Sequence, residues 1–337
     1  MKKYCLVITT IHDSSNEVLQ YIHQGCKAHQ IELIIAGDKK TPGGFKLSNS
    51  SYLSVAAQKK LPFTISKKLP YHAYSRKNLG YLQAIKNGYE VIIETDDDNL
   101  PLAEFWDPRN KQVKGLPVEQ KGWVNVYRFF SDLDIWPRGF NLQEVNTTNK
   151  PKTGTAKSIF CPIQQSLANE NPDVDAIYRL TRPLPVYFKS HPSVILKKGS
   201  ICPFNSQNTT WFKEAFPLLY LPSYCEFRMT DIWRSFVAQR ILWANDWALS
   251  FHTASVNQKR NPHNLFQDFE EESGGYVYNG LMVQELSELN LKKGEQHIPD
   301  NLRLCYKLLV EKGYLKKKEL PLLDCWLTDL EGLRNSG

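Results

Sequence analysis

The feature that most constrains the fold of this chain is a regular alternation of strand-like and helix-like segments over its first hundred residues. Continuous apolar and β-branched runs at 4–11, 31–38 and 89–98 are typical of strands that are covered on both faces. Between them, 14–29 and 75–88 place apolar residues at helical spacing. This order predicts an α/β fold with a doubly wound, mostly parallel central sheet flanked by helices.

The remaining segments follow a less regular pattern. In the first half, we expect a helix at 51–61 and a short strand at 62–65. The second half is rich in proline and aromatic residues, and its expected elements are strands at 123–130 and 185–189 and a helix at 230–246. Beyond residue 276 the apolar spacing is helical only, which predicts a C-terminal helical appendix.

Composition narrows the class of protein. The 42 Lys+Arg residues exceed the 35 Asp+Glu residues by a net charge of +7, spread along the chain. This charge suits an anionic small molecule, but no basic-aromatic patch or known motif favours nucleic acid. No stretch approaches a transmembrane length, so we expect no membrane span, although peripheral membrane association stays open. Seven irregularly spaced cysteines and no cleavable leader favour a cytoplasmic location.

Polar residues end three of the expected strands. Thr9 and Thr10 end the first, Asp38 ends the second, and Asp96–Asp98 end the last. The carboxyl ends of parallel strands form the edge at which such sheets bind ligands. The sequence therefore predicts a ligand site there, while the missing GxGxxG after the first strand argues against a dinucleotide.

The three consecutive aspartates, Asp96, Asp97 and Asp98, repel one another unless a cation sits among them. Carboxylates at i and i+2 can share Mg²⁺ or Mn²⁺, which prefers one or two carboxylates plus phosphate oxygens and water. The alternative is a solvated turn, since Asp-Asn-Leu-Pro suits turn geometry. The position at the end of a buried strand favours the metal, and a metal so held would neutralise a diphosphate.

Five blocks of the sequence resemble the STELLO-type glycosyltransferase-like proteins, distant relatives of the reversibly glycosylated polypeptides, which include UDP-arabinopyranose mutases. The blocks lie at 76–99, 134–140, 172–181, 203–222 and 228–243. The resemblance implies a GT-A fold with a DxD motif and a Rossmann-like nucleotide-binding half. It divides the chain into a GT-A domain at 1–275 and a helical extension at 276–337. Within that domain, 1–100 would bind the nucleotide and 101–275 the acceptor.

The resemblance also implies roles for residues of the first half. Asp96 and Asp98 would bind Mn²⁺ or Mg²⁺ and the diphosphate, and Asp97 would face the ribose or the sugar. Arg76 and Asn78 would reach the diphosphate or the donor sugar, although a solvent-exposed charge is the alternative for Arg76. The nucleoside pocket would be lined by Thr9, Thr10, Ile11 and Asp38.

Further candidates lie in the second half. Asp173 and Asp175 suit hydrogen bonds to sugar hydroxyls, or else a helix cap and turn. Asn205 and Gln207 stand in a run of five hydrogen-bonding side chains, which suits a saccharide or a turn. The resemblance adds a third metal ligand after the helix at 230–246, either His252 or His263, with a structural histidine as the alternative.

Asp231 stands at the start of the expected helix at 230–246. The resemblance suggests a catalytic base that takes the proton of the attacking hydroxyl, whereas the sequence alone favours a helix cap. Arg234, one turn on, would pair with Asp231 or with the leaving phosphate. A base at Asp231 implies direct displacement with inversion. Without one, a retaining route or self-glycosylation stays open.

These observations predict a metal-dependent glycosyltransferase that transfers a sugar from a nucleotide sugar, expected to carry UDP, to a hydroxyl acceptor in surface glycan (polysaccharide) biosynthesis. Its partners would be the donor and a saccharide or other hydroxyl acceptor. One alternative is a nucleotide-sugar mutase or self-glycosylating protein. The other is a non-catalytic scaffold, which the intact acidic cluster disfavours.

Overall fold

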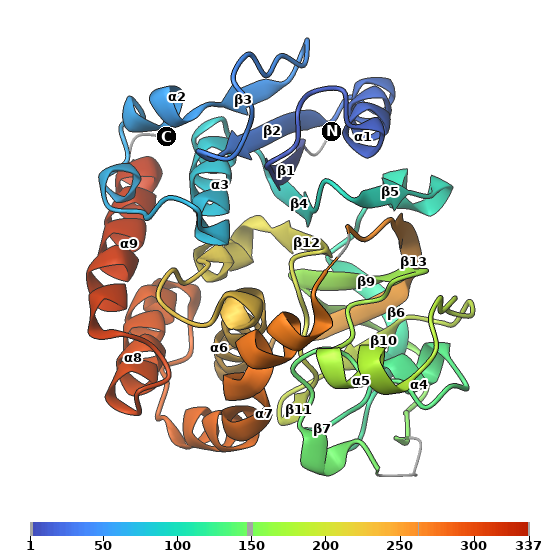
Figure 1. Cartoon of the computed structure of the whole chain (residues 1–337). Coiled ribbons are helices and arrows are strands. Elements are labelled where there is room, and N and C mark those ends of the chain that lie inside the picture. The colour runs from blue at the N-terminus through green and yellow to red at the C-terminus, as the bar shows by residue number, and fades with distance from the viewer. Residues whose placement is uncertain (1–2, 147–150, 262, 336–337) are drawn as a thin grey trace.

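The structure, a computed structural model, describes residues 3–146, 151–261 and 263–335. Within these residues an eleven-stranded sheet runs through both halves of the chain (Figure 1). Its first half is parallel, in the order β3-β2-β1-β4. The bounds are β1 Tyr4–Thr10, β2 Glu32–Gly37, β3 Ser51–Leu53 and β4 Val91–Thr95. The expected parallel sheet in the first hundred residues is confirmed.

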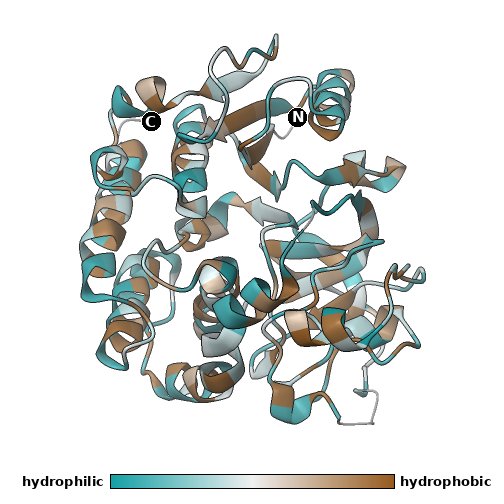
Figure 2. Cartoon of the chain, viewed as in Figure 1, coloured by the Kyte–Doolittle hydropathy of each residue, from teal (hydrophilic) through white to brown (hydrophobic). Residues whose placement is uncertain are grey.

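Alternate residues of the central strands pack against helices on opposite faces of the sheet. Leu6 and Ile8 of β1 lie in one apolar cluster with α1 (Glu17–Ala28). Cys5 and Val7 lie in the other, larger cluster with α3 (Lys77–Lys86). This is why the strand sequences are continuously apolar, and Figure 2 shows apolar residues along these strands.

Helix α3 approaches the sheet closely because Gly80 carries no side chain. A Cβ at this position would meet Cγ1 of Val7 at 2.6 Å. Lys77, at the start of α3, donates to the carbonyl of Thr95 at the end of β4, and Tyr74 lies in the short 3-10 helix just before α3. Both residues contact the acidic loop described below.

The second half of the sheet is mixed, which corrects the prediction of a mostly parallel sheet. β12 pairs antiparallel with β4 and β9, whereas β9 pairs parallel with β13. β13 then pairs antiparallel with β10 and β5, β10 parallel with β6, and β6 antiparallel with β8. The bounds are β5 Asn99–Pro101, β6 Gln112–Pro117, β8 Lys157–Phe160, β9 Ile163–Asn169, β10 Val194–Leu196, β12 Asn208–Phe212 and β13 Leu249–Gln258.

Two strands expected in the second half are wrong. At 123–130 only Trp123 joins a strand, β7 (Gly122–Trp123), which pairs with β11 (Ser200–Ile201). The aromatic residues that follow form the short helix α4 (Tyr127–Phe130), which buries them without strand pairing. At 185–189 the chain makes one isolated bridge, between Glu170 and Val186. Proline at the start of that segment has no N–H to donate to a ladder.

Two expectations in the first half also change. The segment 51–61 is not one helix, because β3 ends at Leu53 and Ser54 then caps α2 (Val55–Lys59) by accepting a bond from Ala57 N at 3.1 Å. The expected strand at 62–65 leads instead into a 3-10 helix at Ile65–Lys67. Its first amides donate to the carboxylate of Asp329, so they are satisfied by α9 rather than by a neighbouring strand.

The helices of the second half are α5 (Ala176–Thr181), α6 (Thr230–Ala244), α7 (Leu265–Glu288), α8 (Ile298–Glu311) and α9 (Leu320–Asn335). In Figure 1 the last two lie beside α6 and α3, and their apolar residues share one cluster with those helices. The expected C-terminal helical region is therefore confirmed. The proposed domain boundary after residue 275 falls inside α7 and stays a prediction. Within the described part of the chain, no helix is long and apolar enough to cross a membrane.

Candidate active site

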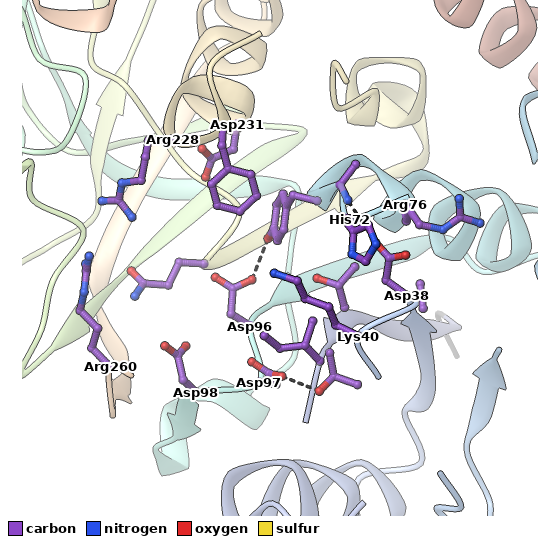
Figure 3. Close-up of a pocket in the computed structure, with 18 of the residues that line it drawn as sticks. Asp38, Lys40, His72, Arg76, Asp96, Asp97, Asp98, Arg228, Asp231 and Arg260 are labelled. Atoms are coloured by element: carbon purple, nitrogen blue, oxygen red, sulfur yellow. Dashed lines mark hydrogen bonds between the residues drawn. The ribbon is translucent and has the colours of Figure 1, made fainter. Parts of the chain in front are cut away.

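A cavity of about 330 Å³ opens at the carboxyl ends of β1, β2 and β4, the ligand-binding edge of such sheets. Figure 3 shows the acidic loop Asp96–Asp98 in its middle. Asp38 and Lys40 lie at one end, and Arg228 and Arg260 at the other. The cavity is lined by most of the predicted site residues: Thr9, Thr10, Ile11, Asp38, Arg76, Asp96, Asp97, Asp98, Asp173, Gln207, Asp231 and His263.

Asp96 is held by the start of α3. Its Oδ1 accepts a hydrogen bond from Tyr74 Oη at 2.7 Å and lies 3.3 Å from Lys77 Nζ. The lysine is fully buried and also donates to Tyr74 Oη and to the carbonyl of Thr95. Burial raises the pKa of Asp96, and Lys77 and Tyr74 act in the opposite direction. Asp96 is thus oriented by its neighbours, through one of its two oxygens.

Asp97 and Asp98 are held differently. Asp97 Oδ2 accepts a hydrogen bond from Thr10 Oγ1 at 2.5 Å, which ties the acidic loop to the end of β1. Asp98 Oδ2 accepts from Gln258 Nε2 at 3.1 Å. Asp98 Oδ1 is buried and has no hydrogen-bond partner among the described residues. Burial, together with the charges of Asp96 and Asp97, raises the pKa of Asp98 to about 7.

The chemistry of the acidic loop fits a divalent cation. An orphaned carboxylate oxygen beside two further carboxylates is the environment that a bound cation would relieve. Over the described ranges no group of three or more His, Cys, Asp or Glu residues could hold a metal ion. A metal here would accordingly depend on one or two carboxylates plus ligand oxygens and water, as Mg²⁺ commonly does.

A second charged group lies beside the loop. Arg138 donates from Nη2 to both oxygens of Asp231 at 3.1 Å, and from Nε to Asp173 Oδ1 at 2.7 Å. Ser206 donates to Asp231 Oδ2 from its backbone and its hydroxyl, both at 3.1 Å. Burial alone would raise the pKa of Asp231, but Arg138, Arg234 and these bonds lower it below its ordinary value. Asp231 lies in the first turn of α6 and is not its N-cap.

Hydrogen bonds connect the acidic loop to Asp231. Tyr74 Oη donates to Asp96 and lies 2.7 Å from Ser206 Oγ, which in turn donates to Asp231. The turn after Arg138 is tight against α6, because Gly139 has a φ of +82° and a Cβ there would meet Ile232 at 2.3 Å. The arrangement of Asp96, Asp231 and Arg138 is therefore fixed by neighbouring elements rather than by a free loop.

The opposite end of the cavity carries the predicted nucleoside residues. Asp38 accepts hydrogen bonds from the backbone of Lys39 at 2.7 Å and of Ala73 at 3.1 Å, which brings the segment before α3 onto the end of β2. Arg76 is almost fully buried and donates from Nε to Gln58 Oε1 at 2.7 Å. Because Arg76 is only 2% exposed, the alternative of a solvent-exposed charge is wrong. In Figure 3 its guanidinium points away from the acidic loop, and a contact with the diphosphate or the donor sugar stays a prediction.

Other predicted residues do not line the cavity. Asn78 bonds the backbone of Leu221 from both side-chain atoms, and Asn205 donates to Asp173 Oδ2 at 2.8 Å. Asp175 is the N-cap of α5 and accepts from Tyr178 N and Trp136 Nε1. The structure thus gives these three a role in packing, and Asn205 alone touches a cavity residue.

Arg234 and His252 lie further away. Arg234 forms a buried two-pronged pair with Glu94, at 2.7 and 3.1 Å, rather than with Asp231 or with the cavity. His252 sits between the hydroxyls of Ser193 and Ser250, each at 2.9 Å, and lines a separate surface groove. Of the two histidines proposed as metal ligands, only His263 lines the cavity, with Nδ1 3.2 Å from Asp268 Oδ1.

Sequence reasoning missed several cavity residues and their supports. Lys77, Arg138 and Arg228 lie inside the blocks at 76–99, 134–140 and 228–243 but received no role, and Arg260 lies outside the blocks. The usable signal was position, because Arg138 follows the Trp-Pro pair of one block and Arg228 opens another. Their partners are far away in the sequence, as in the 93-residue separation of Arg138 and Asp231.

The comparisons with known proteins agree with the resemblance. The family described as STELLO glycosyltransferases matches residues 228–336, which include Arg228, Asp231 and Arg260. Two Arabidopsis thaliana proteins, Probable glycosyltransferase STELLO2 and Probable glycosyltransferase STELLO1, are each 28% identical to the chain over 321 residues. These alignments cover 89% of this chain and 41% of each relative, so the chain spans less than half their length.

A solved structure described as "Crystal Structure of a Mycobacterial Protein" aligns with 84% of this chain and 74% of that chain, at a TM-score of 0.42 and 8% identity. The sequence matches confirm the resemblance to STELLO-type proteins stated above.

Proposed function

We propose that the chain is a glycosyltransferase of GT-A type that transfers a sugar from a nucleotide-sugar donor, expected to be a UDP-sugar, to a hydroxyl of an acceptor. The observation that carries this proposal is the buried Oδ1 of Asp98, which has no hydrogen-bond partner among the described residues and lies next to Asp96 and Asp97 at the ligand-binding edge of the sheet. The similarity to proteins named probable glycosyltransferases supports the reaction class.

The proposed donor position rests on which residues line each end of the cavity. The nucleoside would lie toward Asp38 and Thr10, at the ends of the parallel strands. Asp96 and Asp98 would hold Mn²⁺ or Mg²⁺, and Lys77 would orient Asp96 from behind. A divalent cation bound there supplies positive charge that stabilises the departing diphosphate.

The acceptor would lie at the other end, near Asp231. A carboxylate with a pKa below its ordinary value is ionised at neutral pH and can accept a hydrogen bond from the attacking hydroxyl. Its three donors from Arg138 and Ser206 also make it a weak base. We therefore assign Asp231 to orientation of the hydroxyl and of Arg138, with proton removal as a secondary role.

A panel of UDP-sugars with and without Mn²⁺, read by thermal shift and by product analysis, tests the proposal. We expect one UDP-sugar to raise the melting temperature only when Mn²⁺ is present, because a ligand that binds only the folded state stabilises it. Asp98→Asn should lose this shift, whereas Asp134→Asn, which removes an exposed carboxylate elsewhere, should keep it. Absence of any nucleotide-dependent shift in the wild type would refute the proposal.

The same incubations separate a transferase from a mutase. A mutase would isomerise the UDP-sugar in the absence of an acceptor, whereas a transferase would release UDP slowly by hydrolysis and rapidly once the correct acceptor is added.

A further inference from the structure

The end of the cavity opposite Asp38 is lined by the guanidinium groups of two arginines. Arg228 and Arg260 line the cavity there, while their carboxylate partners, Asp268 and Glu272, lie on α7 outside the lining. Arg260 Nη2 donates to Asp268 Oδ2 at 2.6 Å, and Arg228 Nε donates to Glu272 Oε1 at 2.9 Å. The two arginines thus stand between these carboxylates and the cavity, with the carboxylates supporting them from behind.

The carboxylates do not use all the donors at this end. Asp268 accepts a hydrogen bond from Arg260 and lies 3.2 Å from His263 Nδ1. It also lies 3.9 Å from Arg228 Nε, which is a weaker ion pair. The side chain of Arg260 is 10% exposed, and its buried Nε has no hydrogen-bond partner in the part of the chain that is described. A buried guanidinium donor without a partner carries a desolvation penalty that an anionic ligand would remove.

The remaining carboxylates at this end are already engaged. Asp173 and Asp231 both line the cavity, but each is bonded to Arg138. Among the described residues neither forms an ion pair with Arg228 or Arg260, although the charge of Asp173 acts on Arg260 from a distance. Burial lowers the pKa of Arg260, and the positive charge of Arg228 lowers it further, as expected where cations crowd together.

An aromatic ring completes this end of the cavity. Phe227 directly precedes Arg228, lines the cavity, and is 58% exposed. An exposed phenyl ring beside fixed guanidinium donors suits a ligand with both an apolar ring face and a negative charge. A charged sugar has both features.

We propose that Arg228, Arg260 and Phe227 form a subsite for an acidic sugar, in which the guanidinium groups bind its carboxylate or phosphate and the phenyl ring covers its apolar face. The inference rests on the proposed function, since it names the chemistry of a substrate of that same cavity. The acidic sugar is the acceptor, because the subsite lies beyond the acidic loop from the nucleoside end (Figure 3). An acidic donor sugar is the other source of the same chemistry.

Binding measurements on the full chain saturated with UDP and Mn²⁺ test the acceptor. D-glucuronate and D-glucose 1-phosphate should each bind at least about 10-fold more tightly than D-glucose, a difference of about 1.4 kcal/mol. A parallel arm compares UDP-glucuronate with UDP-glucose, and a preference confined to this arm would assign the acidic group to the donor. If UDP still binds with Mn²⁺ but neither arm prefers the anion, the subsite is refuted while the proposed function stands. If UDP itself fails to bind, the proposed function fails first.

Variants show which residues cause the preference for anionic over neutral sugars. Arg260→Gln should abolish it, and Arg228→Lys, which keeps the charge but loses the fork, should reduce it. Lys40→Gln is the matched control, because it removes one positive charge from the nucleoside end of the same cavity. If Lys40→Gln lost the preference for anionic sugars to the same extent, the preference would come from the overall charge of the cavity and the proposal would be overturned. The wild-type comparison of anionic and neutral sugars decides the case even if Arg260→Gln does not fold.

Discussion

Glu94 and Asp98, two carboxylates four residues apart in the sequence, differ in how far their oxygens are hydrogen-bonded. Glu94, on β4, is fully buried, and Arg234 contacts its two oxygens at 2.7 and 3.1 Å. It also accepts hydrogen bonds from Trp211 Nε1 at 2.8 Å and from Tyr81 Oη. Asp98, just past the end of the same strand, has one oxygen on Gln258 and the other without a partner among the described residues.

The difference separates a structural charge from a functional one. A buried carboxylate with every lone pair engaged, as in Glu94, holds elements together, here β4, β12 and α6, and offers no free oxygen to a cation. A carboxylate left unpaired beside two others is a destabilising arrangement that a cation would relieve. Substitution at each position should therefore act on a different property of the protein.

The largest effect is expected at Glu94. Glu94→Gln leaves the buried guanidinium of Arg234 without its counter-charge, so we expect the free energy of unfolding to fall by about 3–5 kcal/mol. Urea denaturation measures this. A loss under about 1 kcal/mol would mean that the pair is not the structural charge described above.

At Asp98 the expected effect moves from stability to binding. Asp98→Asn removes a repelled charge, so the free energy of unfolding should stay the same or rise, while Mn²⁺-dependent UDP affinity falls by about 100-fold or more. Calorimetric titration and urea denaturation of the same preparation measure both. A variant that is destabilised yet binds UDP and Mn²⁺ normally would reverse the contrast with Glu94.

His252 extends the comparison to a partly buried base outside the cavity. Burial, together with the charge of Arg109, lowers its pKa from 6.5 to about 4. As pH falls, the unfolded chain binds this proton near pH 6.5 and the folded chain only near pH 4, so the contribution of His252 to stability is lost across that window. We expect this contribution to be about 2 kcal/mol smaller at pH 5 than at pH 7.

Urea denaturation of the wild type and of His252→Gln at both pH values isolates this contribution, because the variant should show a correspondingly smaller loss between pH 7 and pH 5. Identical pH profiles for the two proteins would contradict the assignment of His252 as a neutral, partly buried group.

The smallest effect is expected at an exposed carboxylate. Asp134 is 51% exposed and lies 3.2 Å from Arg128 and 3.0 Å from Arg182. Exposed pairs contribute little because water and salt screen them, so Asp134→Asn should change the free energy of unfolding by less than about 1 kcal/mol. If Asp134→Asn lost as much free energy of unfolding as Glu94→Gln in the same urea assay, the size of the effect would depend on ion pairing and not on burial.

The sequence was sufficient to predict what local pattern determines. The continuous apolar strands at 4–11 and 31–38 and the helical spacing at 230–246 each produced the expected element. The acidic loop was found because its charges follow a buried strand directly. Trp123 to Phe130 was misjudged because aromatic residues can be buried by a short helix as well as by a strand.

Contacts between distant parts of the chain were beyond the sequence. Arg234 was expected to pair with Asp231, three residues earlier, but the fold brings Glu94 to it from 140 residues away. Lys77 received no role from the sequence, yet it is fully buried at the start of α3, the helix that packs closely on the sheet at Gly80. Such pairings depend on which faces of which elements meet, and no local pattern records that.

We propose that Asp98 binds a divalent cation together with the diphosphate of the donor. Anomalous diffraction from a crystal grown with Mn²⁺ and UDP tests this proposal. We expect a manganese peak bound by Asp98 and by an oxygen of the diphosphate. A map with UDP in the cavity but no manganese at Asp98, or with Asp98 paired to Arg260 instead, would contradict it.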